Sequence, residues 1–154
     1  MNGNTVFDCA LIELKRHTSP RLGNLSVVES GETLPFDVKR VFHIYDVPGG
    51  ASRGGHAHIA VYEFIVAASG SFTVTVDDGN QKRTFLLNRP YQGLLIVPGV
   101  WLTLQDFSSG AIALVMTSDY FDSSDHIKDY DEFLRRKREA KAAKPEAPGQ
   151  KESM

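Results

Sequence analysis

The sequence of 154 residues contains a single cysteine, Cys9. An internal disulfide is therefore excluded. The N-terminus also lacks a signal-peptide pattern, and the two absences together predict a protein of the reducing cytoplasm. No run of about 20 apolar residues is present, which excludes a membrane-spanning helix. The length is that of a single domain.

A strong net charge is also missing, since 17 Lys and Arg residues nearly balance 19 Asp and Glu residues. The formal charge of −2 argues against nucleic acid as a partner. The charge is unevenly spread, because residues 135–154 contain seven Lys or Arg and only three Glu. We interpret residues 1–134 as the folded domain, including the start of a C-terminal helix. Residues 135–154 are interpreted as a basic helix end and a disordered tail.

Short β-prone segments make up most of the chain. Runs of β-branched, aromatic and aliphatic residues alternate with Gly, Pro and Asp clusters, which predicts strands at 6–14, 25–29, 40–47, 61–67, 71–76, 82–87, 93–97, 101–107 and 111–117. Residues 77–80 supply hairpin-turn residues between two of these strands. So many strands predict an all-β fold with a closed or doubled sheet. One helix is expected, at 127–143.

The most informative segment is Arg53-Gly54-Gly55-His56-Ala57-His58. In a strand, residues i and i+2 project from the same face, so both imidazoles are expected to point into one cavity. The wider spacing, from Gly50 through Glu63 to Gly70, resembles the first signature of the cupin superfamily. That resemblance implies a jelly-roll barrel, also called a double-stranded β-helix, with its chemistry in the mouth.

Two neighbouring imidazoles lower each other's pKa, since adjacent cations repel, so we expect both rings to be neutral. A neutral imidazole in a cavity is a metal ligand or a general base. Cupin metal sites usually add a third histidine from a second motif, but the matching stretch, 93–102, has Leu102 in that place. His56, His58 and Glu63 alone can hold iron or zinc. We expect no metal, and leave this alternative open.

Blocks of sequence spread over the chain carry a closer resemblance. They are 34–47, 53–58, 77–79, 93–108 and 118–133. In order and spacing they resemble the sugar-nucleotide 3,4-ketoisomerase family, also called WxcM-like cupins, over roughly residues 5–134. The family implies a cofactor-free isomerase that converts dTDP-4-keto-6-deoxyglucose into its 3-keto isomer for an aminotransferase. It also implies a homodimer, with His56 as the catalytic base and His58 as the second active-site imidazole.

Candidate substrate-binding residues flank the histidines. Arg40 and Arg53 are candidates for binding the diphosphate of the substrate, because guanidinium groups match phosphate oxygens. An equally good explanation is that they are solvent-exposed residues at the ends of strands. Trp101 is a candidate platform for the sugar ring, with a core indole as the alternative.

Three residues of the substrate site depart from the family pattern. Phe42 stands where the family often has tyrosine, Leu102 where His or Arg is expected, and Leu22 where a residue facing the sugar is usually polar or aromatic. The C4 configuration of the product, galacto or gluco, therefore cannot be read from the sequence. These apolar residues also leave open a non-catalytic sugar-binding cupin. A metal-dependent cupin oxygenase that uses the two histidines is the other alternative.

Overall fold

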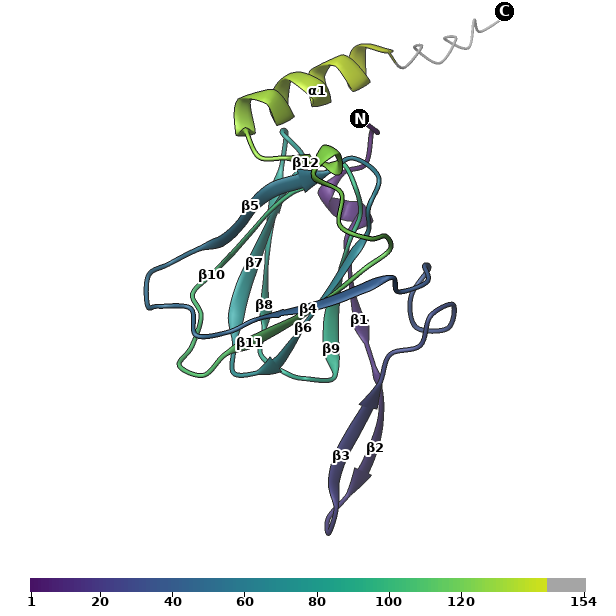
Figure 1. The fold of residues 1–154 in the computed structure, drawn as a ribbon, viewed down its shortest axis with the longest axis vertical. Helices are drawn as coiled ribbons and strands as arrows, with labels where there is room; N and C mark the ends of the chain where they lie inside the picture. Colours follow the sequence, from purple (N-terminus) through teal and green to yellow (C-terminus); the bar gives the residue numbers. More distant parts are fainter. Residues whose placement is uncertain (144–154) are drawn as a thin grey trace, which may run out of the picture.

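The computed structural model describes residues 1–143. Two antiparallel five-stranded sheets face each other (Figure 1). The first has the order β1 (Ala10–Glu13), β9 (Gln92–Ile96), β6 (Glu63–Ser69), β11 (Ile112–Thr117) and β4 (Arg40–Ile44). The second has the order β12 (His126–Ile127), β5 (Arg53–His58), β10 (Trp101–Gln105), β7 (Phe72–Asp77) and β8 (Lys82–Leu87). This is the doubled sheet that the strand pattern predicts.

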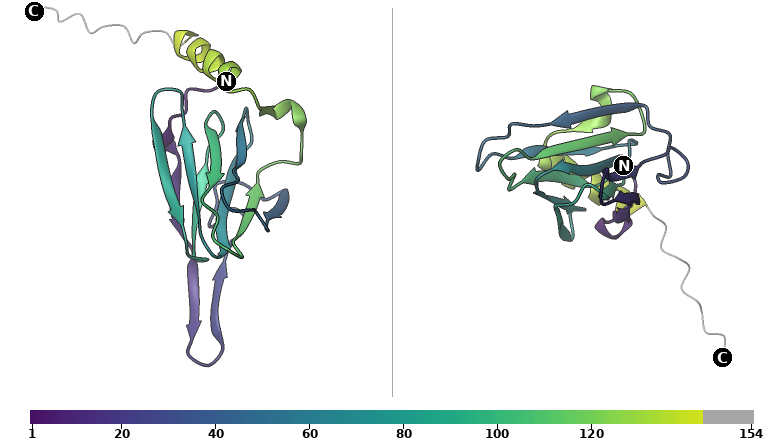
Figure 2. Two further views of the ribbon diagram at one scale, coloured as in Figure 1. Left: turned by 90° about the vertical axis from the view of Figure 1, so that its left-hand side faces the viewer. Right: turned by 90° about the horizontal axis from the view of Figure 1, so that it is seen from below.

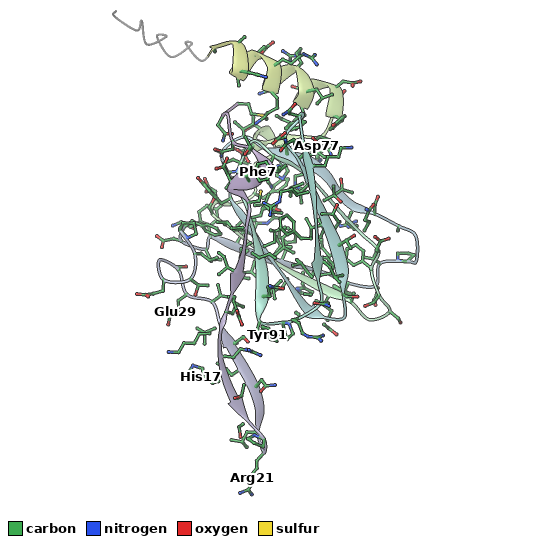
Figure 3. All side chains as sticks on the ribbon, turned by 180° about the vertical axis from the view of Figure 1, so that it is seen from behind. Phe7, His17, Arg21, Glu29, Asp77 and Tyr91 are labelled. Atoms are coloured by element: carbon green, nitrogen blue, oxygen red, sulfur yellow. The ribbon has the colours of Figure 1, made fainter. Side chains whose placement is uncertain are left out.

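The apolar core lies between these sheets, as the alternation of side chains requires. In β7, Phe72, Val74 and Val76 are fully buried, while the threonines between them are partly exposed. Ile65 of β6 and Val115 of β11 face them from the other sheet. Figure 3 shows side chains filling the space between the strands.

A two-stranded hairpin extends away from the sheets, formed by β2 (Lys15–Ser19) and β3 (Gly23–Val27) (Figures 1 and 2). Most of its residues are exposed, and Leu22 at its tip is 91 % exposed. The expected strand at 6–14 is wrong at its beginning. Val6–Asp8 forms a short 3-10 turn, because the side chain of Thr5 accepts a hydrogen bond from the amide of Phe7.

The single α-helix of the described residues, α1 (Tyr130–Ala143), covers one end of the two sheets (Figure 1). It begins three residues later than expected, because Ile127 pairs with β5 instead and Asp129 caps the helix by accepting from the amides of Asp131 and Glu132. Phe133 of this helix is fully buried, in a cluster with Ala57 and Ile127.

Within residues 1–143, no helix has the length and apolar character needed to cross a bilayer. The tail predicted at 144–154 lies outside the described residues.

Candidate active site

A glycine bend sets the direction of the histidine strand. Gly54 and Gly55 have φ angles of +84° and +69°, which side chains other than glycine rarely adopt. A Cβ atom on Gly54 would lie 3.0 Å from the carbonyl oxygen of Leu102. The pairing of β5 with β10 is irregular here, since Leu102 pairs with His56 and Thr103 with Gly54. The bulge turns the strand so that His56 lies beside Leu102 in the cavity.

His56 and His58 lie together, as their i, i+2 spacing predicts. Their Nε2 atoms are 3.3 Å apart, and their rings are almost perpendicular at 4.9 Å between centroids. The two differ in burial: the His58 side chain is 5 % exposed and that of His56 is 19 % exposed. His56 therefore faces the cavity, and His58 lies behind it.

Both ring nitrogens of His58 are bound by carboxylates. Its Nε2 atom lies 2.7 Å from Oε1 of Glu63, and its Nδ1 atom lies 2.9 Å from Oδ2 of Asp125. The second oxygen of Asp125 accepts a hydrogen bond from the amide of Ala60, 2.8 Å away, which ties this carboxylate to the end of β5. Because each carboxylate accepts from an N–H, the arrangement favours the doubly protonated ring.

The charge of this cluster corrects the expectation of two neutral imidazoles. Burial opposes the charge of His58, but hydrogen bonds and attraction from Glu63 and Asp125 outweigh it, so the His58 pKa is raised. Burial likewise opposes the charge of Glu63, yet the contacts of its carboxylate with His56 and His58 lower its pKa to about 2. Repulsion between imidazoles is thus outweighed at His58 by Glu63 and by Asp125, a carboxylate that the sequence argument did not place beside it.

A third imidazole belongs to the same cluster. His126 of β12 pairs with His58 across the sheet, with ring centroids 4.5 Å from His58 and 5.3 Å from His56. Its Nδ1 atom lies 3.0 Å from the carbonyl oxygen of Asp122, to which it donates. Burial lowers the His126 pKa, and the two neighbouring histidines lower it further, partly offset by the Asp122 carbonyl.

A cavity of about 330 Å³ opens beside His56 between the sheets. Small-molecule sites commonly measure about 300–1,000 Å³, so there is room for a hexose. Polar groups occupy one part of the wall and apolar side chains the rest. The lining residues are Phe42, Ile44, Ser52, Arg53, Gly54, His56, Glu63, Ile65, Leu102, Leu104 and Val115.

The structure brings three of the predicted substrate-binding residues to this wall, namely Arg53, Phe42 and Leu102. Arg40 lies next to it, with its guanidinium carbon 4.6 Å from the ring centre of Phe42 and 5.1 Å from that of Phe121. Within residues 1–143 neither arginine forms an ion pair. Both guanidinium groups are therefore available to an anionic ligand.

Two other candidates lie outside the cavity. Trp101 projects from the opposite face of β10, where its ring packs against Tyr130 and Phe133 of α1 at 5.2 and 5.7 Å. Alternation along β10 places Leu102 in the cavity and Trp101 out of it, so the structure corrects the predicted platform and favours the core indole. Leu22 lies at the hairpin tip, away from the cavity of its own chain (Figure 1), and its contact with the sugar stays a prediction.

Comparison with known proteins agrees with this geometry. The model of the family described as "WxcM-like, C-terminal" matches residues 7–138. A TDP-4-oxo-6-deoxy-alpha-D-glucose-3,4-oxoisomerase of Aneurinibacillus thermoaerophilus is 40 % identical over 113 residues, which cover 73 % of this chain and 81 % of the relative. The chain belongs to the WxcM-like ketoisomerase family.

Solved structures of ketoisomerases have the same fold. A 3,4-ketoisomerase from Helicobacter canadensis is 34 % identical, with a TM-score of 0.82 over 85 % of this chain and 98 % of that one. A 3,4-ketoisomerase mutant from Thermoanaerobacterium thermosaccharolyticum, in complex with TDP-4-keto-6-deoxyglucose, is 30 % identical, with a TM-score of 0.84 over 88 % and 97 %. The predicted all-β cupin fold with a C-terminal helix is confirmed.

Sequence reasoning missed Asp125 and His126. Both follow the last long strand, and His126 taken alone is typical of a half-buried histidine bonded to a backbone carbonyl. The hydrogen bond from His58 to Asp125 joins residues 67 positions apart in the chain. The two-residue strand β12 carries no periodic pattern, so no local signal places it beside β5.

Proposed function

We propose that this protein converts dTDP-4-keto-6-deoxy-D-glucose into a dTDP-3-keto-6-deoxyhexose, with His56 as the base. Membership of the ketoisomerase family supports the reaction type. The observation that carries the assignment to His56 is that its ring faces the cavity, while both nitrogens of His58 are bound by carboxylates. A base must reach the proton that it removes, and of this histidine pair only His56 lines the cavity.

The reaction requires two proton transfers between adjacent carbons. His56 removes the proton on C3 beside the C4 ketone, and the electron pair forms an enediolate. A proton then returns to C4, and the proton of the C3 hydroxyl passes to the C4 oxygen, so that C3 becomes the ketone and C4 carries the hydroxyl. The isomers have the same composition and oxidation level, so the step needs no oxidant or reductant.

His58 stabilises the charge that develops during this step. As an imidazolium it places a positive charge whose Nε2 atom is 3.3 Å from that of His56, next to where the enediolate forms. Glu63 and Asp125 hold this ring in place and favour its protonated form. The apolar walls keep water away from the intermediate and strengthen these interactions.

We propose that two arginines and the wall of the cavity bind the nucleotide sugar. Arg53 and Arg40 hold the diphosphate, and Phe42 and Leu102 contact the sugar. The 3-keto product carries the carbonyl group that an aminotransferase requires, which places the enzyme before a transamination in deoxyamino-sugar and surface-polysaccharide synthesis. We place this reaction in the cytoplasm.

We further propose a homodimer. The β2–β3 hairpin is exposed over most of its length, and an isolated two-stranded hairpin is only marginally stable in water. Contact with a second copy would cover it. Leu22 faces the sugar, as the family resemblance implies, only if the hairpin of one protomer reaches the cavity of its partner. Light scattering of the purified protein tests the expected mass of two chains.

Solvent exchange tests the isomerase proposal directly. Incubation with dTDP-4-keto-6-deoxyglucose in deuterated water should place deuterium on the sugar ring. Mass spectrometry of the sugar nucleotide measures this labelling. His56→Asn should slow this by about 10²–10⁴-fold, the usual contribution of a positioned base. His43→Ala, which removes an exposed histidine stacked on Tyr45, is the matched control and should label normally.

Two results would overturn the proposal. An unlabelled sugar ring at high concentration of the wild-type enzyme would exclude isomerisation of this substrate. If the substrate still bound under those conditions, the non-catalytic sugar-binding alternative would replace the isomerase. Normal labelling by His56→Asn would exclude His56 as the base.

A further inference from the structure

The three imidazoles of the cluster each bring one possible ligand atom close to the other two. One ring nitrogen each from His56, His58 and His126 lies within 4.8 Å of the other two. The first two come from β5 and the third from β12, which pairs with β5 at the edge of the sheet. Leu102 occupies the place where a third histidine was sought in the sequence, and His126 brings a third imidazole from the opposite side of β5.

We propose that this cluster binds a divalent transition-metal ion of the zinc and cobalt class. The ligands are His56, His58 and His126, with the carboxylate of Glu63 as the fourth. Imidazole nitrogen and carboxylate oxygen are established zinc ligands, and four of them satisfy tetrahedral coordination.

The distances suit such an ion. Zinc–nitrogen bonds of about 2.0–2.1 Å place two nitrogens of a tetrahedral site roughly 3.3 Å apart. The Nε2 atoms of His56 and His58 are 3.3 Å apart, and Oε1 of Glu63 lies 2.7 and 3.8 Å from them. The ring nitrogen of His126 lies within 4.8 Å of the other two, so completing the set requires this partly buried ring to move inward.

The surroundings of the rings also match a metal site. Histidine ligands almost always donate their second ring N–H to a carboxylate or a backbone carbonyl, which orients the ring. Nδ1 of His58 is bound by Asp125, and Nδ1 of His126 by the carbonyl of Asp122. Both rings are thereby turned with Nε2 toward the cluster.

Metal binding would regulate the enzyme. An ion on Nε2 of His56 occupies the lone pair that removes the C3 proton, so the bound ion blocks isomerisation. This consequence alone rests on the proposed function. The metal site itself depends only on the positions of the ligands.

Cobalt(II) provides the test, because its visible absorption reports tetrahedral nitrogen and oxygen ligands without any measurement of activity. Titration of the metal-free full-length protein should give intense visible bands that saturate at one ion per chain, and zinc should displace the cobalt. Asp125→Asn should weaken affinity by about 10–100-fold, as is typical when the partner of a ligating histidine is lost. His126→Ala should weaken affinity by at least as much, and His43→Ala is the matched control.

The outcomes separate the two proposals. Absence of the cobalt bands, or equal affinity of wild type, His126→Ala and His43→Ala, would overturn the metal site. Circular dichroism spectra that match wild type exclude misfolding as the cause of lost binding. Labelling by metal-free protein in deuterated water tests the isomerase separately. The metal proposal predicts that this labelling stops when one equivalent of zinc is added, and unchanged labelling with bound zinc contradicts its inhibitory role.

Discussion

The space between the two sheets contains two regions of opposite character that are built from the same strands. Along the inner face of β6, buried Glu63 is followed by Ile65 and Ala67. The carboxylate end contacts His56 and His58, while the apolar end joins a core that includes the fully buried Phe72. The comparison shows that alternation decides which side chains point inward. The order of residues along each strand decides where polar groups give way to apolar ones.

The two regions contribute in different ways. Burial of apolar area supplies most of the stability of such a domain. The polar cluster contributes through charges that the surrounding apolar groups shield from water, and this shielding strengthens their interactions. We therefore expect substitutions in the apolar region to act on stability, and those in the polar region to act on stability, charge state and chemistry together.

The largest effect on stability is expected at Phe72, which is fully buried among apolar neighbours. Phe72→Ala should lower the free energy of unfolding by about 3–5 kcal/mol, because it removes a large buried ring and leaves a cavity. Urea denaturation followed by circular dichroism measures the change. Leu86→Ala, on an exposed side chain of the neighbouring strand β8, is the control. A loss at Phe72 no larger than that at Leu86 would contradict the assignment of the core.

The next effect is expected at Glu63, whose pKa falls from 4.5 to about 2 in the folded protein. A shift of this size corresponds to about 3 kcal/mol at neutral pH. A lowered carboxyl pKa stabilises the fold above pH 4.5, and this contribution is lost as the pH falls from 4.5 to about 2. Glu63→Gln should therefore be less stable than wild type at pH 7, and the difference should shrink as the pH falls through this range. A pH-independent difference in urea denaturation would contradict the linkage.

A smaller effect, confined to charge state, is expected between neighbouring imidazoles. The pKa of His58 is raised and that of His126 is lowered, although their ring centroids are only 4.5 Å apart. A raised histidine pKa stabilises the fold below pH 6.5, and this contribution is lost as the pH rises through the folded pKa of His58. Histidine NMR titration should show His126 losing its proton at lower pH than His58. The reverse order would mean that the carboxylates do not control the charge of His58.

The smallest effect is expected at the hairpin tip, outside both regions. Leu22→Ser should change the free energy of unfolding by less than about 0.5 kcal/mol, because Leu22 is 91 % exposed and surface substitutions usually have effects of this size. Urea denaturation at low protein concentration measures it. A large loss of stability at a concentration at which light scattering shows a monomer would place Leu22 in a packed region that the fold does not show.

Much of the apolar region could be predicted from sequence, because alternation is a local signal. The segments 71–76 and 82–87 were expected as a hairpin, and the structure places β7 and β8 there with Phe72, Val74 and Val76 inward. The i, i+2 spacing of His56 and His58 likewise predicts their shared face. The direction of the Trp101 side chain could not be predicted in the same way. Alternation alone does not say which of two neighbouring residues, Trp101 or Leu102, faces inward.

The remainder of the polar cluster could not be predicted, because it depends on contacts between distant parts of the chain. The charge of His58 is set by Glu63 and Asp125 together, and an argument from the histidine pair alone predicts the opposite sign. A strand of two residues, with Asp125 just before it and His126 within it, has no periodicity to recognise. Only the folded pairing of β12 with β5 reveals these two residues.

The tie between Asp125 and His58 also bears on how the protein is made. During synthesis from the N-terminus, all the other strands of both sheets leave the ribosome before β12 does. A chain truncated before residue 125 would therefore keep the other strands of both sheets, with His56, His58 and Glu63, but would lack the carboxylate on Nδ1 of His58. The carboxylate that holds Nδ1 of His58 is therefore among the last parts of the two sheets and their connections to be synthesised.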